Sequence, residues 1–256
     1  MTEKKANNAD EGIPWLQEYS RVASIKWQDS DNVHISHVRN FNYSAEVHPI
    51  QDWYDCQLKV SDVIAVDLVL SYWSGNAIAH VFLSFGLKNG QWLAISIETR
   101  RRQNQSWSAF GGFFKNYPLV YVVADERDLI GVRVNVRKER VYLYPLNITL
   151  QQSQDLLRSY LLRIEKVNQH PEWYNTLLNN CTSNIFHHGK SVSSAVKYDW
   201  RILVSGYADQ YCYKNKLLEN SLPFEDLKRR SRIIHSDVPT IGQTYSMDIR
   251  RNRRVV

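Results

Sequence analysis

The chain has 256 residues and a formal net charge of +6, with 43% hydrophobic and 23% charged residues. This balance excludes a disordered or collagenous chain and is ordinary for a globular protein that buries its own core. Much of the positive charge lies in RRNRR (Arg250–Arg254), which supplies four arginines. We interpret this cluster as a solvated tail, because no nucleic-acid-binding module accompanies it.

The cysteines and the apolar runs narrow the class of protein further. Cys56, Cys181 and Cys212 cannot all pair with one another, so a disulfide scaffold is excluded and at least one thiol is free. The first residues, MTEKKANNADEG, contain no apolar signal core. No later run approaches the roughly 18 apolar residues of a membrane span. The sequence therefore predicts a chain without an integral membrane segment.

The segment from Val33 to Leu146 has the pattern of β-strands. Polar and apolar residues alternate over Val33–Phe41, whereas Val63–Trp73 and Ala77–Leu87 are almost continuously apolar, as in strands buried on both faces. Asn89-Gly90 supplies the positive φ angles of a hairpin turn, so Gln91–Arg100 should return antiparallel. Three further strands are predicted in LVYVVADE (119–126), IGVRVNVR (130–137) and VYLYPL (141–146).

Helical periodicity begins at Thr149. Apolar residues recur at helical spacing up to Val167, Thr149 and Gln152 form a capping box, and Pro171 ends the helix. A short helix should follow Asn180, and two more are expected within 208–220 and 224–235. We therefore expect one α+β domain, an antiparallel sheet packed against helices, over residues 27–235. An N-terminal tail (1–26) and a basic C-terminal tail (236–256) should flank it.

The segment WYNTLLNNCTSNIFHH contains a cysteine among polar neighbours. Asn180 is a favourable N-cap, so Cys181 should be the first residue of a helix. The positive end of the helix macrodipole lowers the pKa of a thiol placed there. Cys181 is therefore the candidate nucleophile, and the alternative is a cysteine that only fills space. Cys56 and Cys212 lack such a cap and are predicted to be structural.

A thiolate nucleophile needs a base, and His80 is the best candidate because it stands alone in the apolar run AIAHVFLSF. The alternative is a core histidine bonded to a backbone carbonyl. Counting outward from the Asn-Gly turn places Glu98 opposite residue 81. An imperfect register or a bulge would bring Glu98 beside His80 as an orienting carboxylate. Ser96 is a weaker alternative partner.

An acyl-transfer site also needs hydrogen-bond donors for an oxyanion. The backbone N–H of Cys181 is the first expected donor, since a helix start leaves it without an intrahelical partner. Among side chains, we favour Tyr72 over Asn179 and Asn180, because Asn180 is expected to cap the helix.

Other motifs exclude other chemistries. His187 and His188 point in different directions on a helix and cannot chelate a metal as a pair, so we interpret them as a solvated helix end. GGFF (Gly111–Phe114) lacks the glycine spacing of a dinucleotide site and the lysine of a P-loop. We expect no cofactor, no metal and no nucleic-acid partner.

The chain resembles the N-terminal periplasmic domain family of the lipoprotein intramolecular transacylase Lnb. The resemblance runs from about Trp27 to Arg232 and is carried by VRNFNY, DLVLSYW, AHVFLSFGL, SIETRR, GGFFKNYPLVYVVADERD, VYLYPL, WYNTLLNNCTSNI and PFEDLKRRSRI. It implies a permuted papain-like (NlpC-type) core in which the histidine strand precedes the cysteine helix. It also implies that Cys181 and His80 form the catalytic pair, with Glu98 as the third polar residue.

The resemblance implies acyl-transfer chemistry on bacterial lipoproteins, in a periplasmic or extracytoplasmic location. The leading interpretation is a thiol acyltransferase with an apolar groove beside Cys181. A cysteine hydrolase of the cell envelope, with water as the acceptor, is the second. The third is a binding module with a vestigial pair, which a buried Cys181 far from His80 would favour. We expect a lipid-modified or cell-envelope substrate and peripheral contact with a membrane.

Overall fold

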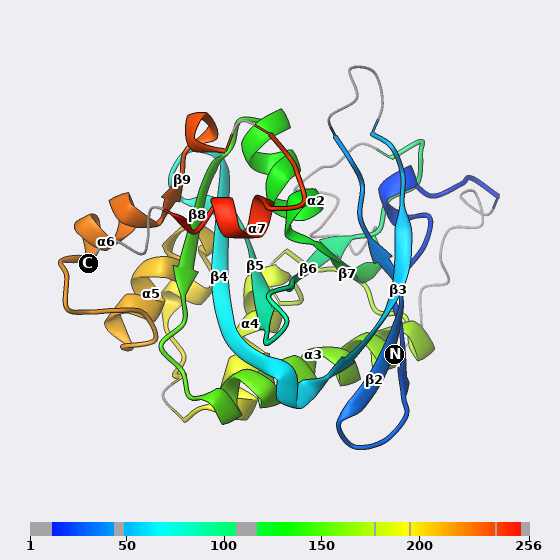
Figure 1. The fold of residues 1–256 in the computed structure, drawn as a ribbon, viewed down its shortest axis with the longest axis horizontal. Coiled ribbons are helices and arrows are strands. Elements are labelled where there is room, and N and C mark those ends of the chain that lie inside the picture. The colour runs from blue at the N-terminus through cyan, green and yellow to red at the C-terminus, as the bar shows by residue number, and fades with distance from the viewer. Residues whose placement is uncertain are drawn as a thin grey trace.

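The computed structural model describes residues 12–43, 49–105, 117–176, 178–194, 196–238 and 240–251. Within these residues, nine strands form one sheet and helices pack on both of its faces (Figure 1). The strands are β1 (Ser24–Trp27), β2 (Asn32–Arg39), β3 (Trp53–Lys59), β4 (Val63–Ser74), β5 (Ile78–Leu87), β6 (Trp92–Thr99), β7 (Leu119–Asp125), β8 (Arg140–Pro145) and β9 (Arg232–Ile233). The main helices are α2 (Glu126–Gly131), α3 (Leu150–Gln169), α4 (Cys181–Val192), α5 (Ala208–Lys214), α6 (Phe224–Ser231) and α7 (Tyr245–Asp248).

The strands follow the order β1-β2-β7-β6-β5-β4-β8-β9, and β3 also pairs with β2. The pairing of β2 with β7 is parallel, whereas the other strand pairs in the described residues are antiparallel. The expected α+β class is therefore confirmed, with a mixed sheet in place of a purely antiparallel one. The permuted papain-like arrangement stays a prediction.

The two faces of the sheet carry two separate apolar cores. On one face, which we call the α3/α4 face, Val81 and Leu83 of β5 pack with residues of α3 and α4. On the other, the α2/α7 face, Phe82 packs with residues of α2 and α7. Because side chains alternate along a strand, neighbouring residues of β5 point to opposite faces. This alternation determines which parts of the sequence can meet.

The turn between β5 and β6 contains Asn89-Gly90, as predicted, and spans Lys88–Gly90. Leu87 N–H donates to Gln91 O, which closes a three-residue loop, and Gly90 is the residue of that loop with a positive φ, at 85°. The loop pairs Leu83 with Ile95 and Gly86 with Trp92. The pairing ends at Leu83 and Ile95, so it includes neither His80 nor Glu98. The register itself differs by one residue from the one used in the prediction, which would have placed Leu83 opposite Ser96.

The segment IGVRVNVR is not a strand, contrary to the prediction. Ile130 belongs to α2, and Val132–Val136 continue it as a π-helical turn. The alternating valines favour a strand locally, but buried ion pairs fix the helix. Asp128 binds Arg39, and Arg133 donates to the Leu129 carbonyl and to Glu98. Tertiary contacts thus override local β propensity.

The later helices begin where the sequence predicts. Thr149 and Gln152 form the capping box of α3, and α5 and α6 lie within the two segments expected to be helical. None of the helices in the described parts of the chain is long and apolar enough to cross a membrane. GGFF lies outside the described residues.

Both segments predicted as tails contain packed residues. β1 pairs with β2, and the side chains of Tyr19 and Tyr245 are buried in the α2/α7 face. Arg250, the first arginine of RRNRR, binds Asp67 and Glu126 and lies over the Trp92 ring. The prediction of a solvated cluster was therefore wrong for Arg250, because it neutralises two buried carboxylates.

Candidate functional site

Cys181 is the first residue of α4, as predicted. Asn180 is the N-cap: its side chain accepts a hydrogen bond from Ser183 N at 2.8 Å, and its own N–H donates to Ser183 Oγ at 2.9 Å. This capping box fixes the start of α4, and the helix packs against β5. The side chain of Asn180 is occupied in the cap, which agrees with the preference for another residue as an oxyanion donor.

The Cys181 thiol is buried in the core of the α3/α4 face, with 6% of the residue exposed. Its sulfur lies 3.8 Å from Thr182 Oγ1 and beside the backbone of Val81. Burial raises the pKa of the thiol even though these polar neighbours favour the thiolate. The expected lowering of the pKa was therefore wrong, because desolvation exceeds the effect of the helix start.

The half-buried side chain of Tyr174 packs against the core that contains Cys181. Burial raises the pKa of the Tyr174 hydroxyl, and the nearby Cys181 raises it further. Tyr174 was not singled out from the sequence, since nothing in WYNTLL distinguishes this tyrosine from a core aromatic residue.

His80 lies on the other face of the sheet. Val81, the next residue of β5, belongs to the α3/α4 core that contains Cys181. The His80 ring packs instead against Phe82, with 5.6 Å between ring centroids, and Phe82 belongs to the α2/α7 core. The sheet separates the two side chains, so the predicted hydrogen bond between His80 and Cys181 was wrong.

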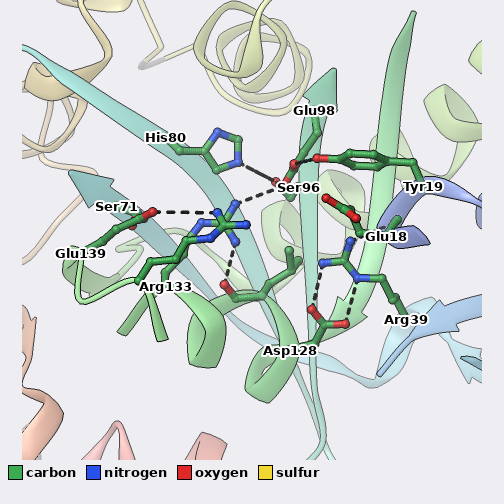
Figure 2. A network of polar contacts seen from close by, with 12 residues as sticks. Glu18, Tyr19, Arg39, Ser71, His80, Ser96, Glu98, Asp128, Arg133 and Glu139 are labelled. Atoms are coloured by element: carbon green, nitrogen blue, oxygen red, sulfur yellow. Dashed lines mark hydrogen bonds and ion pairs between the residues drawn. The ribbon is translucent and has the colours of Figure 1, made fainter. Parts of the chain in front are cut away.

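The partners of His80 are Ser96 and Glu98 on β6 (Figure 2). Nε2 of His80 lies 2.6 Å from Ser96 Oγ, which donates to Glu98 Oε1 at 2.9 Å. Nε2 is 3.7 Å from the same carboxylate oxygen. The pairing of His80 with Glu98 is therefore indirect, and Ser96, the weaker alternative in the sequence, makes the closer contact.

Two further residues hold Glu98. Tyr19 donates to Oε2 at 2.7 Å, and Arg133 donates to Oε1 at 3.1 Å. Burial raises the pKa of this carboxyl, but Arg133, His80, Arg39 and the Tyr19 hydrogen bond together outweigh burial and hold the pKa of Glu98 well below its usual range. Burial also lowers the pKa of His80 to about 4, with a further contribution from Arg133. His80 is therefore neutral at physiological pH.

A polar cavity of about 190 Å³ adjoins this network. Glu98 and Arg133 border it, together with Tyr19, Arg39 and Arg137. Arg39 is committed to a bidentate pair with Asp128, with both N–O distances at 2.8 Å (Figure 2). Arg133 and Tyr19 were not predicted as site residues, because Arg133 was assigned to a strand and Tyr19 to a tail.

Tyr72 shares the α3/α4 face with Cys181, but its hydroxyl belongs to another cluster. It donates to the Gly206 carbonyl at 2.7 Å, lies 3.3 Å from buried Asp209, and accepts from Lys228 at 3.2 Å. Lys228 also pairs with Asp209 at 2.9 Å. Because the single hydroxyl proton goes to Gly206, the structure does not present Tyr72 as a donor to an oxyanion at Cys181.

An apolar cavity of about 80 Å³ lies beside the start of α4, between β4, β5, α3, α4 and α5. Val81 and Thr182, the two residues in contact with the Cys181 sulfur, form part of its wall. The remainder is mainly aliphatic and aromatic, with Leu83, Ile185 and Ile202 among the lining side chains. A cavity of this volume has room for several waters but offers them few hydrogen-bond partners.

The sequence model of the Lnb N-terminal periplasmic domain matches residues 50–206, which is more than half of the chain and includes Cys181, His80 and Glu98. The chain belongs to this family. No curated protein and no solved structure gives a significant match. The Lnb N-terminal domain family supports a lipoprotein-related role and an extracytoplasmic location.

In this Lnb N-terminal domain, one further histidine differs from its prediction. His188 is buried under α3, where Nδ1 lies 2.7 Å from Ser159 Oγ and Nε2 lies 3.0 Å from the Tyr121 hydroxyl. Burial lowers its pKa to about 3. The interpretation as a solvated helix end holds for exposed His187 and was wrong for His188. The described part of the domain contains no cluster of three or more histidine, cysteine, aspartate or glutamate side chains arranged to hold a metal ion.

Proposed function

We propose that this domain binds an acyl chain of a lipid-modified protein in the apolar cavity beside α4. The cavity is the observation that supports this function. Its walls are mainly apolar, so water inside it would lose hydrogen-bond partners, whereas a hydrocarbon chain would gain burial at about 25 cal/mol per Å² of apolar surface. The lipoprotein-related family supplies the class of protein that carries such a chain.

A fluorescent fatty acid, 11-(dansylamino)undecanoic acid, tests this function. We expect saturable binding that a synthetic diacylated lipopeptide displaces and its unacylated peptide does not. Ala208 lines the cavity, so Ala208→Phe should reduce binding about tenfold or more by filling it. Leu162 is exposed on α3, so Leu162→Phe is the matched control. Binding that is equal in both variants, at matched folding by circular dichroism, would exclude the cavity.

Acyl transfer at Cys181 is the second candidate function. It is favoured by the position of the sulfur, which touches two residues of the cavity wall. In the first step, the thiol would attack an ester carbonyl, the carbon–oxygen bond would break, and the glycerol oxygen would take the thiol proton. In the second step, an amine would take the acyl group from the thioester and the thiol would be restored. Water in place of the amine would make the same site a hydrolase.

This second candidate requires a base other than His80, which faces the opposite side of the sheet. Incubation with the diacylated lipopeptide, followed by mass spectrometry, tests it. A hydroxylamine-sensitive acyl adduct on Cys181, together with product that Cys181→Ala cannot form, would establish acyl transfer. Unchanged fatty-acid binding with no adduct and no product would leave acyl-chain binding as the function.

A further inference from the structure

One segment between α4 and α5 has two unlike sides. Val196 and Ile202 are buried and line the apolar cavity. Tyr198, Trp200 and Leu203 of the same segment are 70%, 53% and 49% exposed. We refer to these three side chains as the aromatic rim. One side of this segment therefore forms part of the cavity wall. Its other side exposes large apolar side chains.

The aromatic rim is held in place rather than loosely attached. Tyr198 packs edge-on against Phe186 of α4 at 6.3 Å between centroids, and Trp200 lies 5.6 Å from Tyr207. The Tyr211 hydroxyl of α5 donates to Lys197 O at 2.7 Å. The three side chains are thus exposed on a fixed backbone, which reduces the entropy lost when a partner covers them.

The charge around the aromatic rim is positive. Residues 186–217 contain five basic residues, Lys190, Lys197, Arg201, Lys214 and Lys216, and two acidic residues. Both acids are paired, Asp199 with Arg201 at 2.7 Å and Asp209 with Lys228 at 2.9 Å. Hydrogen bonds from Arg201 lower the pKa of Asp199, and the nearby Lys214 lowers it further. Lys190, Lys197, Lys214 and Lys216 are exposed and flank the rim in the sequence, so they would favour an anionic surface.

We propose that the aromatic rim docks on the surface of an anionic lipid bilayer and brings the cavity to the lipid. Tyrosine and tryptophan favour the interface between headgroups and acyl chains, and lysines beside them attract anionic headgroups. This inference rests on the proposed acyl-chain site, because it names the source of that chain.

Vesicle sedimentation tests the proposal. We expect the wild-type domain to bind phosphatidylcholine vesicles that contain phosphatidylglycerol, and to bind pure phosphatidylcholine less tightly. The double variant Trp200→Ser/Leu203→Ser should lose about tenfold or more of this binding. Met247 is also exposed but lies on α7, which packs on the opposite face of the sheet, so Met247→Ser should leave the binding unchanged.

The same variants separate this inference from the proposed function. Binding of 11-(dansylamino)undecanoic acid in the absence of vesicles should remain in Trp200→Ser/Leu203→Ser. Wild-type protein that binds the fatty acid but no vesicle would overturn bilayer docking and leave the acyl-chain site intact. Vesicle binding equal in the double variant and the wild type would overturn it also. So would a wild-type dimer that the double variant abolishes, because the rim would then be covered by a second copy.

Discussion

His80 and Cys181 lie on opposite faces of the sheet, although the Cys181 sulfur touches Val81, the residue that follows His80. Each of the two side chains has its own neighbours and its own adjoining cavity. His80 bonds to Ser96 beside a polar cavity, and Cys181 is buried beside an apolar one. The two residues that the family resemblance pairs therefore belong to separate sites in this structure.

Acid should destabilise the domain through its two buried histidines. The folded pKa values of His80 and His188 are about 4 and about 3, below the ordinary value of about 6.5 in an unfolded chain. The unfolded state therefore binds protons first, and stability is lost as pH falls from about 6.5 toward 4. Urea unfolding at several pH values checks the loss. NMR should show both imidazole signals unchanged down to pH 5, and a His80 titration near 6.5 would contradict the burial argument.

Thiol alkylation should be slow in the folded protein. Burial raises the pKa of Cys181, and it raises those of Cys56 and Cys212 to about 11 and about 12. Because the thiolate is the reactive form, iodoacetamide should label the native thiols slowly at pH 7.5 and faster at pH 9. Peptide mapping after labelling gives the rate at each cysteine, and urea-unfolded protein gives the reference. Rapid native labelling of Cys181 at pH 7.5 would show an activated thiolate.

Arg250→Ala should destabilise the fold strongly. Asp67 and Glu126 are buried, and Arg250 binds both with N–O distances of 2.7 and 2.6 Å. Its removal takes the arginine counter-ion away from both buried carboxylates, which should cost about 3–5 kcal/mol in the free energy of unfolding. Arg251 pairs with Asp248 at the surface, so Arg251→Ala should cost less than about 1 kcal/mol. Chemical unfolding compares the two, and equal losses would refute the role of Arg250.

Gly206→Ala should displace the segment that follows the aromatic rim. A Cβ at this position would lie 2.8 Å from the Ala77 carbonyl oxygen, which is backbone of the β4–β5 hairpin and cannot rotate away. Overpacking of this kind costs about 1–3 kcal/mol. Gly242 has no atom within 4 Å of the same position, so Gly242→Ala is the matched control. Thermal unfolding measures both, and similar melting temperatures would contradict the close approach.

The sequence could predict the elements whose signals are local. The capping residues Thr149 and Asn180 fixed two helix starts, and continuous apolar runs marked β4 and β5. The register between β5 and β6 depends on the number of residues in the turn, which the Asn-Gly pair alone does not determine. The helical conformation of Val132–Val136 depends on long-range contacts such as the ion pair between Arg133 and Glu98, which the local sequence does not reveal.

The site was less predictable than the fold because its chemistry depends on burial. A helix start lowers a thiol pKa when water reaches it, and the sequence around Cys181 does not reveal that the sulfur is covered. The face on which His80 lies follows from strand alternation relative to Val81, but only once α4 is known to pack on the Val81 side. Long-range packing therefore places His80 and Cys181 on opposite faces of the sheet, although local sequence patterns had predicted that they would be in contact.

The ion pairs of Arg250 with Asp67 and Glu126 also bear on how the core forms during synthesis. Asp67 and Glu126 leave the ribosome well before Arg250, so the emerging sheet carries two carboxylates whose counter-ion has not yet been translated. Domains generally fold from their N-terminal part during synthesis, at about 5–20 residues per second. The two carboxylates therefore keep their hydration until the arginine docks on Trp92. The core of the α2/α7 face can be completed only after Arg250 has been added to the chain.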